Sequence, residues 1–292
     1  MREVLAASRP FSWINTAYPF AAGYLVATGG RVDVALVVGT LYFLVPYNLL
    51  MYGVNDVFDY ESDLRNPRKG GIEGALADPA TARATHRRIL WACVLTNVPL
   101  VVWLLALGDA WAAVTLLVVV FLVVAYSAPG LRFKERPFVD SATSAMHFVG
   151  PLLYALVLAD ADLAARAVWP VLVGFVLWGM ASHAFGAVQD VRADREAGIG
   201  SVATVVGAHA TVLGAAAAYL AAAVVLALQP WPGALAALLP LPYAVNVLRF
   251  RDVRDDDCER ANAGWRTFLW LNLVTGFLVT MLLIATSLLD AG

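Results

Sequence analysis

Long apolar stretches separated by short polar segments run through the whole chain. Each is long enough, or nearly long enough, to cross a hydrocarbon core of about 30 Å as a helix. The stretches cover residues 11–29, 34–54, 89–107, 111–127, 138–158, 168–188, 205–228, 232–248 and 265–288. We therefore expect an all-α polytopic membrane protein with nine transmembrane helices. Because no linker or low-complexity segment interrupts the pattern, we expect residues 1–292 to form a single domain.

The composition supports a membrane protein whose main partner is the lipid bilayer. Of the 292 residues, 61% are hydrophobic and 14% are charged, and the mean hydropathy is +0.72. Ordinary soluble domains carry about 25% charged residues. The net charge is −2 and the basic residues form no stripe, so nucleic acid is not expected as a partner. Cys93 and Cys258 lack the spacing of a disulfide framework or a zinc site.

The positions of the basic residues indicate the orientation of the chain. With nine spans, 18 of the 20 Lys and Arg fall on one side, and only Arg31 and Arg166 fall on the other. The basic side comprises residues 1–10, 55–88, 128–137, 189–204 and 249–266. Cytoplasmic loops carry an excess of Lys and Arg. We therefore expect the amino terminus in the cytoplasm and the carboxyl terminus outside the cell.

Two acidic clusters lie where apolar stretches end on the expected cytoplasmic side. The first is Asn55-Asp56-Val57-Phe58-Asp59-Tyr60-Glu61-Ser62-Asp63 and the second is Asp190-Val191-Arg192-Ala193-Asp194. Carboxylates at the border of hydrocarbon are costly, so they persist mainly where they bind something. On a helix, Asp56, Asp59 and Asp63 would fall within an arc of about 60°. Asp190 and Asp194 would likewise lie one turn apart. Such oxygen-rich stripes suit Mg²⁺, which combines one or two carboxylates with water and substrate phosphates.

Basic and aromatic residues near these clusters have more than one interpretation. After the first cluster, Arg68 and Lys69 precede Gly70-Gly71 and could hold phosphate oxygens, although an Arg-rich loop is often only a topology signal. Lys134 could neutralise a leaving diphosphate or simply anchor a helix at the interface. Tyr126 could lie near the reacting group or belong to an interfacial aromatic belt.

Two histidines lie within apolar segments. His147 and His183 are each more typical of a hydrogen-bonded core histidine than of a proton acceptor, and both interpretations stay open.

The motifs together resemble the UbiA superfamily of intramembrane prenyltransferases. The resemblance rests on N-D-x-x-D-x-x-x-D at 55–63, D-x-x-x-D at 190–194, the Tyr-to-Lys segment 126–134, Arg9-Pro10, Trp13 and residues 19–23. One departure is Ala187, where many members carry a further aspartate, and Gln189 could complete that metal site instead. The stretch Asn-Pro-Arg-Lys-Gly-Gly-Ile-Glu-Gly-Ala at 66–75 is similar to the lycopene elongases of actinobacteria and haloarchaea.

The resemblance implies a function, a fold and a set of site residues. It implies a UbiA-like bundle in a prokaryotic cell membrane, with a cytoplasmic-side active site that transfers a prenyl group from its diphosphate to a hydrophobic acceptor. The lycopene elongases imply lycopene as acceptor and dimethylallyl as donor group, with or without hydration, in carotenoid biosynthesis. The implied metal ligands for Mg²⁺ are Asp56, Asp59, Asp63, Asp190 and Asp194; Lys134 and Tyr126 join them as catalytic residues, and Asn55, Arg9, Arg68 and Lys69 bind substrate. Phe58, Tyr126 and Phe185 are candidates to stabilise an allylic cation with an aromatic face.

Other functions remain open at the level of sequence. Within the same fold the acceptor could be an aromatic ring such as 4-hydroxybenzoate, a tetrapyrrole or a glycerol phosphate. Intramembrane acids could also mark a cation transporter, whose site would be expected nearer the middle of the bilayer. A cytidine diphosphate alcohol phosphotransferase is disfavoured because its D-G-x-x-A-R element is absent from the sequence.

Overall fold

The structure is a computed structural model that describes residues 2–64 and 77–290, apart from the side chains of Ser62, Asp63 and Asp290. The described residues form helices and no strand. They divide into two compact units, residues 1–133 with 146–161 and residues 134–145 with 162–292. Helix α8 contributes its first residues to the second unit and the rest to the first. The prediction of a single domain over the whole chain stays a prediction.

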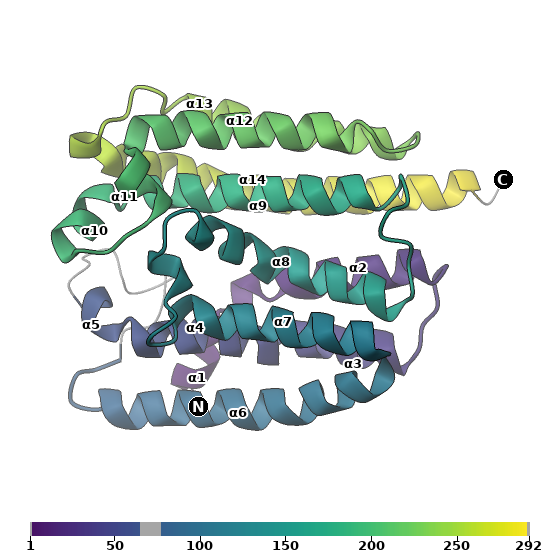
Figure 1. Cartoon of the computed structure of the whole chain (residues 1–292), viewed down its shortest axis with the longest axis horizontal. Helices are drawn as coiled ribbons and strands as arrows, with labels where there is room; N and C mark the ends of the chain where they lie inside the picture. The colour runs from purple at the N-terminus through teal and green to yellow at the C-terminus, as the bar shows by residue number, and fades with distance from the viewer. Residues whose placement is uncertain (1, 65–76, 291–292) are drawn as a thin grey trace. The chain divides into compact units, whose positions relative to one another are not determined.

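The elements follow one another along the chain as shown by the labels and colours of Figure 1. They are α1 (Arg2–Ala7), η1 (Pro10–Ser12), α2 (Ile14–Ala27), α3 (Val34–Leu44), α4 (Pro46–Phe58), α5 (Tyr60–Asp63), α6 (Ala82–Leu107), α7 (Ala110–Ser127), η2 (Phe133–Glu135), α8 (Val139–Leu158), α9 (Trp169–Val188), α10 (Val191–Ala197), α11 (Val202–Val206), α12 (Ala208–Leu226), η3 (Gly233–Leu238), α13 (Leu241–Leu248), η4 (Asp255–Ala261) and α14 (Asn262–Asp290).

The first unit is built around the helix pair α3–α4, which Pro46 divides. Proline removes a backbone donor and leaves carbonyls of the preceding turn without their helical partner. Asn48 donates to the carbonyls of Phe43 at 2.9 Å and Leu44 at 3.1 Å, and Asn97 of α6 donates to the carbonyl of Pro46 at 2.9 Å. Backbone groups in a bilayer must find partners within the protein. Buried amide side chains therefore make the break at Pro46 tolerable, and α4 then packs against α6 and α7 (Figure 1).

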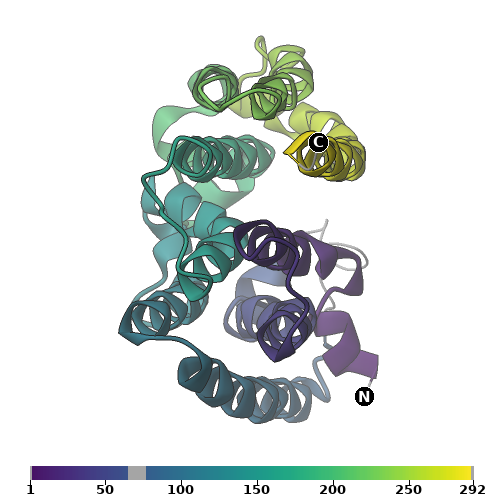
Figure 2. The same cartoon turned by 90° about the vertical axis from the view of Figure 1, so that its right-hand side faces the viewer.

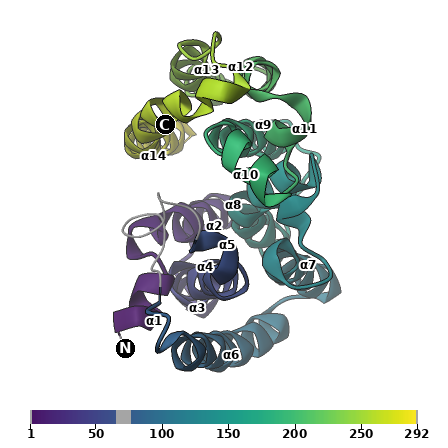
Figure 3. The same cartoon turned by 90° about the vertical axis from the view of Figure 1, so that its left-hand side faces the viewer.

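The second unit is a bundle in which α9, α12, α13 and α14 pack on one another, seen end-on in Figure 2. Its core contains Phe185, Tyr219, Tyr243 and many alanines, which let the helices approach closely. The buried Ser182 and Tyr219 hydroxyls are 2.9 Å apart, so each polar group has a partner. Figure 3 views the ends of these helices, where the short helices α10 and α11 follow α9.

The predicted spans compare with the structure as follows. Within the described residues, seven segments are long and apolar enough to cross a membrane, which confirms an all-α polytopic fold. They are Val34–Phe58, Ala82–Leu107, Ala110–Ser127, Val139–Leu158, Trp169–Val188, Ala208–Leu226 and Asp255–Leu289. The predicted span 11–29 forms the 14-residue helix α2, and 232–248 forms η3 and α13. The count of nine transmembrane helices therefore stays a prediction.

Candidate active site

The first acidic motif begins on α4 and continues past the end of that helix. The helix ends at Phe58, Asp59 follows as its C-cap with φ −101° and ψ −1°, and α5 starts at Tyr60. The expectation of one continuous helix through the three aspartates is therefore wrong, because the helical hydrogen-bond pattern is interrupted at Asp59. Asp63 is the last residue of α5, and its side chain lies outside the described residues.

Asp56 and Asp59 of this motif are buried and lie against cations, whereas Glu61 is exposed. Asp56 is 7% exposed and Asp59 is 3% exposed. Arg9 Nη2 lies 2.9 Å from Asp56 Oδ1, and Arg132 Nη2 lies 3.4 Å from Asp59 Oδ1. Asn55 donates to Asp59 Oδ2 at 2.6 Å and to Ser127 Oγ at 2.9 Å, which ties α4 to the end of α7. Asn55 and Arg9, which we predicted to bind substrate, therefore each contact an aspartate of the motif directly.

Both arginines occupy the left-handed region of backbone space. Arg9 has φ 49° and Arg132 has φ 42°. This conformation costs a residue other than glycine about 1–2 kcal/mol, and such strain tends to persist at functional sites. The Arg9 guanidinium also lies 4.3 Å from the centre of the Tyr52 ring, a cation–π distance. Sequence reasoning missed Arg132, because nothing in its own segment indicates that it reaches Asp59.

The other predicted residues of this region are only partly described. The Tyr126 ring, near the end of α7, stands edge-on to the His147 ring with the two centres 5.0 Å apart. Lys134 lies in η2 and is partly buried. Arg68 and Lys69 lie outside the described residues, so their predicted phosphate contacts stay predictions.

The second acidic motif repeats the backbone arrangement of the first. Helix α9 ends at Val188, and Asp190 follows with φ −101° and ψ −5° as the N-cap of α10, which contains Asp194. These torsions nearly equal those of Asp59. The amide oxygen of the buried Gln189 accepts a hydrogen bond from Asn262 at 2.7 Å. Gln189 therefore has a packing role in its own unit.

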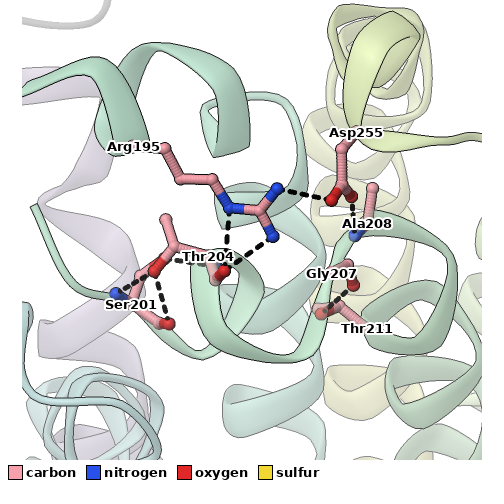
Figure 4. A network of polar contacts seen from close by, with 7 residues as sticks. All are labelled: Arg195, Ser201, Thr204, Gly207, Ala208, Thr211 and Asp255. Carbon is pink, nitrogen blue, oxygen red and sulfur yellow. Dashed lines mark hydrogen bonds and ion pairs between the residues drawn. The ribbon is translucent and has the colours of Figure 1, made fainter. Parts of the chain in front are cut away.

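A network of polar contacts anchors the helix that carries Asp194 (Figure 4). The guanidinium of Arg195 donates to the Thr204 carbonyl at 2.9 and 2.7 Å and to Asp255 Oδ2 at 2.5 Å. Asp255 Oδ1 accepts from the backbone N–H of Ala208 at 2.7 Å, at the start of α12. Arg192 is likewise paired with Glu259, so the basic residues of the motif hold α10 against η4.

The donor set of each motif fits Mg²⁺ chemically. Mg²⁺ prefers oxygen ligands and uses one or two carboxylates per site, with phosphates and water completing the octahedron. Asp56 and Asp59 present buried carboxylate oxygens, and Asp190 and Asp194 lie one helical turn apart. Within the part of the chain that the structure describes, no three His, Cys, Asp or Glu side chains gather as a ready-made metal cage.

A family model covers most of the chain. The UbiA prenyltransferase family model matches residues 16–273. The chain belongs to the UbiA prenyltransferase family. This prenyltransferase is 47% identical over 285 residues to a lycopene elongase/hydratase of Corynebacterium glutamicum, covering 98% of this chain and 97% of that one. It is 54% identical over 278 residues to the C(50) beta-cyclic carotenoids biosynthesis protein LbtBC of a Dietzia species, covering 95% of this chain. The prenyltransferase spans 63% of the length of that second relative.

Solved structures share the fold of this prenyltransferase. A UbiA homologue from Archaeoglobus fulgidus, solved with DMAPP and Mg²⁺ bound, has a TM-score of 0.70. The match covers 94% of this chain and 98% of that one at 15% identity. The family resemblance drawn from the acidic motifs is thereby confirmed, as is the prediction of an integral membrane prenyltransferase.

Proposed function

We propose that this prenyltransferase moves a dimethylallyl group from its diphosphate to an end of lycopene, in an Mg²⁺-dependent reaction of carotenoid biosynthesis. The observation that carries the proposal is the 47% identity to a lycopene elongase/hydratase over nearly the full length of both chains. The buried acidic motif on α4 supplies the chemistry, because its carboxylates and their arginine partners form a charged site at the end of an apolar helix.

The residues of the site bind and orient the diphosphate in this proposal. Bound Mg²⁺ neutralises the charge that grows on the departing diphosphate. Asp56, Asp59 and Asp63 would hold one ion, and Asp190 and Asp194 would hold the other. Asn55 fixes Asp59 through its hydrogen bond and thereby sets the direction of a ligand oxygen.

Cations around the acidic motifs add to the charge stabilisation. Arg9 and Arg132 already contact the acidic motif, and Lys134, Arg68 and Lys69 are proposed to hold diphosphate oxygens. Fixed charges act strongly in a site that excludes water. Breaking the carbon–oxygen bond of the donor then leaves an allylic cation.

The acceptor completes the reaction without activation by a strong base. The terminal double bond of lycopene attacks the allylic cation and a carbon–carbon bond forms. The tertiary cation that remains on the acceptor then loses a proton, or captures water and gives up a proton from that water to solvent. Tyr126 and Phe58 are the aromatic residues that we retain as candidates to stabilise the cation. Phe185 is 1% exposed and packs on Phe250 within the core of the second unit, so it does not support that role.

Expression in a bacterial host that accumulates lycopene tests the proposal. We expect mass spectrometry of the pigments to reveal carotenoids heavier by one and then two five-carbon units, some with added water. The variant Asp56→Asn, at equal protein level, serves as the inactive control. Unchanged lycopene, together with prenylation of an added aromatic acid or quinone precursor, would show that the acceptor is wrong while the reaction type is right.

A further inference from the structure

The end of helix α7 reaches the first acidic motif through a buried serine. Ser127 is the last residue of α7 and is 1% exposed. Its Oγ accepts a hydrogen bond from Nδ2 of Asn55 at 2.9 Å. The two residues are 72 positions apart in the chain, so the contact depends on the packing of α4 against α7. The sequence analysis gave Ser127 no role.

The hydrogen bonds of Asn55 account for both hydrogens of its amide group. An asparagine amide nitrogen carries two hydrogens, and the amide oxygen can only accept. Nδ2 donates to Asp59 Oδ2 at 2.6 Å as well as to Ser127 Oγ. The two bonds together fix the plane of the amide. In this arrangement Asn55 orients Asp59 and has no hydrogen left for a diphosphate oxygen.

The turn that follows α7 holds the other oxygen of the same carboxylate. Arg132 comes five residues after Ser127, and its Nη2 lies 3.4 Å from Asp59 Oδ1. Asp59 therefore has one oxygen held by Asn55 and the other held by Arg132. The end of α7 thus acts on this carboxylate twice, directly through Arg132 and indirectly through Ser127.

Asp59 depends on such contacts because of its position in the backbone. It is the C-cap of α4, and its backbone N–H donates to the carbonyl of Asn55 at 2.9 Å. This bond places the Asp59 backbone but leaves the rotation of the carboxylate open, since the last side-chain torsion of aspartate has a broad energy minimum. Hydrogen bonds to the carboxylate oxygens therefore decide its orientation.

The burial of Ser127 makes its oxygen important for Asn55. A buried N–H group that loses its acceptor must move or stay unsatisfied, and both are costly. Without the Ser127 hydroxyl, the second hydrogen of Asn55 Nδ2 has lost its acceptor and the amide can rotate. The bond from Asn55 to Asp59 then no longer has a fixed direction.

We propose that Ser127 is a positioning residue for the metal–diphosphate site and acts through Asn55 on the carboxylate of Asp59. The inference rests on the proposed function, in which Asp59 helps to hold Mg²⁺. Hydrogen-bond partners behind metal ligands orient those ligands, and their loss typically costs about 10–100-fold in metal affinity or activity. A carboxylate that is already oriented loses less freedom when a ligand binds. Ser127 thus raises the metal affinity of the site without contacting the metal or the substrate.

The test measures metal binding directly, with Mn²⁺ as a paramagnetic probe that accepts the same carboxylate ligands as Mg²⁺. Electron paramagnetic resonance follows binding to purified protein in detergent, with dimethylallyl diphosphate present and no acceptor. We expect Ser127→Ala to raise the dissociation constant for Mn²⁺ about tenfold. Ser127→Thr, which keeps the hydroxyl, should restore the affinity. The matched control Ser182→Ala removes a buried hydroxyl that bonds to Tyr219 in the second unit, and it should leave the affinity unchanged.

A double-mutant cycle tests whether Ser127 acts through Asn55. Effects of residues that act through one another are not additive. Ser127→Ala should therefore have little further effect on Mn²⁺ affinity in a protein that already carries Asn55→Ala. Full additivity would overturn the inference, as would an unchanged affinity in Ser127→Ala or an equal loss in Ser182→Ala.

Thermal unfolding without metal checks that each variant is folded. If Ser127→Ala does not accumulate as folded protein, Ser127→Cys replaces it, because a thiol is only a weak acceptor. A parent protein that elongates lycopene but binds no Mn²⁺ would overturn the inference and leave prenyl transfer to lycopene intact. If the parent and the variants bind Mn²⁺ as expected but lycopene is not elongated, the proposed acceptor fails and the inference stands.

Discussion

Asp56 and Asp59 of the first acidic motif are unusual at the level of single residues, because each carboxylate is almost fully buried and lies beside an arginine. Breaking a buried ion pair by removing one partner is strongly destabilising, by about 3–5 kcal/mol, because the other charge stays behind uncompensated. The pair of Arg9 with Asp56 therefore has structural as well as chemical importance. Variants of Asp56 must be judged at equal protein level.

The first prediction concerns both acidic motifs. Asp56→Asn and Asp190→Asn should each reduce prenyl transfer by at least a hundredfold, because one ligand oxygen and its charge are lost from each proposed metal site. Addition of a chelator to parent membranes should have the same effect, reversed by Mg²⁺. Activity is measured in membranes that contain equal amounts of protein. Full activity in either variant would contradict the two-metal assignment.

The second prediction separates the charge of Arg132 from its backbone strain. Arg132→Gly removes the left-handed penalty of about 1–2 kcal/mol. It also takes a cation from the buried Asp59, which costs about 3–5 kcal/mol, so the melting temperature should fall. Measured at equal protein level, the variant should lose at least tenfold in activity, since the cation beside Asp59 is gone. The matched control is Asp160→Gly, at an exposed residue with φ 54°, which should keep full activity. Equal activity in both variants would show that Arg132 has no part in the reaction.

The sequence predicted the aspartates of the candidate site but not Arg132. The spacing of aspartates at 56, 59, 190 and 194 indicated metal chemistry because carboxylates are rare at the edge of apolar helices. Arg132 was not found, because its contact with Asp59 depends on a left-handed turn that no residue pattern requires at that position.

At the level of helices, the polar residues inside apolar segments explain how the chain tolerates interruptions. Asn48 is fully buried and donates to two carbonyls and to Thr16 Oγ1, all around the break between α3 and α4. The sequence predicted a span at 34–54 but not its division, although Pro46 was the available signal. The breaks at Asp59 and Asp190 carry neither proline nor glycine, so only the structure reveals them.

The third prediction concerns the break at Pro46. Asn48→Leu should lower the free energy of unfolding by about 1–3 kcal/mol, because buried carbonyls lose their donor without access to water. The measurement is thermal or denaturant unfolding in detergent. Thr115→Val, on an exposed face where the hydroxyl bonds only within its own helix, is the control and should change stability by less than about 0.5 kcal/mol. A similar small effect for Asn48→Leu would contradict the role of Asn48.

At the level of the whole molecule, the distribution of basic residues and the apolar helices both indicate a polytopic membrane protein. Seven segments within the described residues qualify as membrane spans by length and composition. The two predicted spans that fall short are the 14-residue helix α2 and the segment that η3 and α13 divide between them. Hydropathy alone could not reveal this, because it measures composition and not helix continuity.

The fourth prediction tests the orientation of the chain. Reporter fusions after residues 80 and 255 should report a cytoplasmic location, and a fusion at Gly292 should report an extracytoplasmic one. The physical reason is that 18 of the 20 basic residues fall on one side when nine spans are assumed. A cytoplasmic carboxyl terminus would show that one of the shorter helices does not cross the membrane.

The contact of Arg9 with Asp56 has a thermodynamic consequence for the amino-terminal segment. Arg9 is held in a left-handed conformation directly before η1, and its guanidinium is paired with the carboxylate. The coupling between two binding events is reciprocal. A cation or ligand that displaces Arg9 from Asp56 must therefore destabilise the conformation of the Arg9 segment by the same free energy. Ligand binding at the acidic motif should therefore change the protease sensitivity of residues 2–12, and Arg9→Gly should abolish that change. The first residues of the chain would then report occupancy of the site.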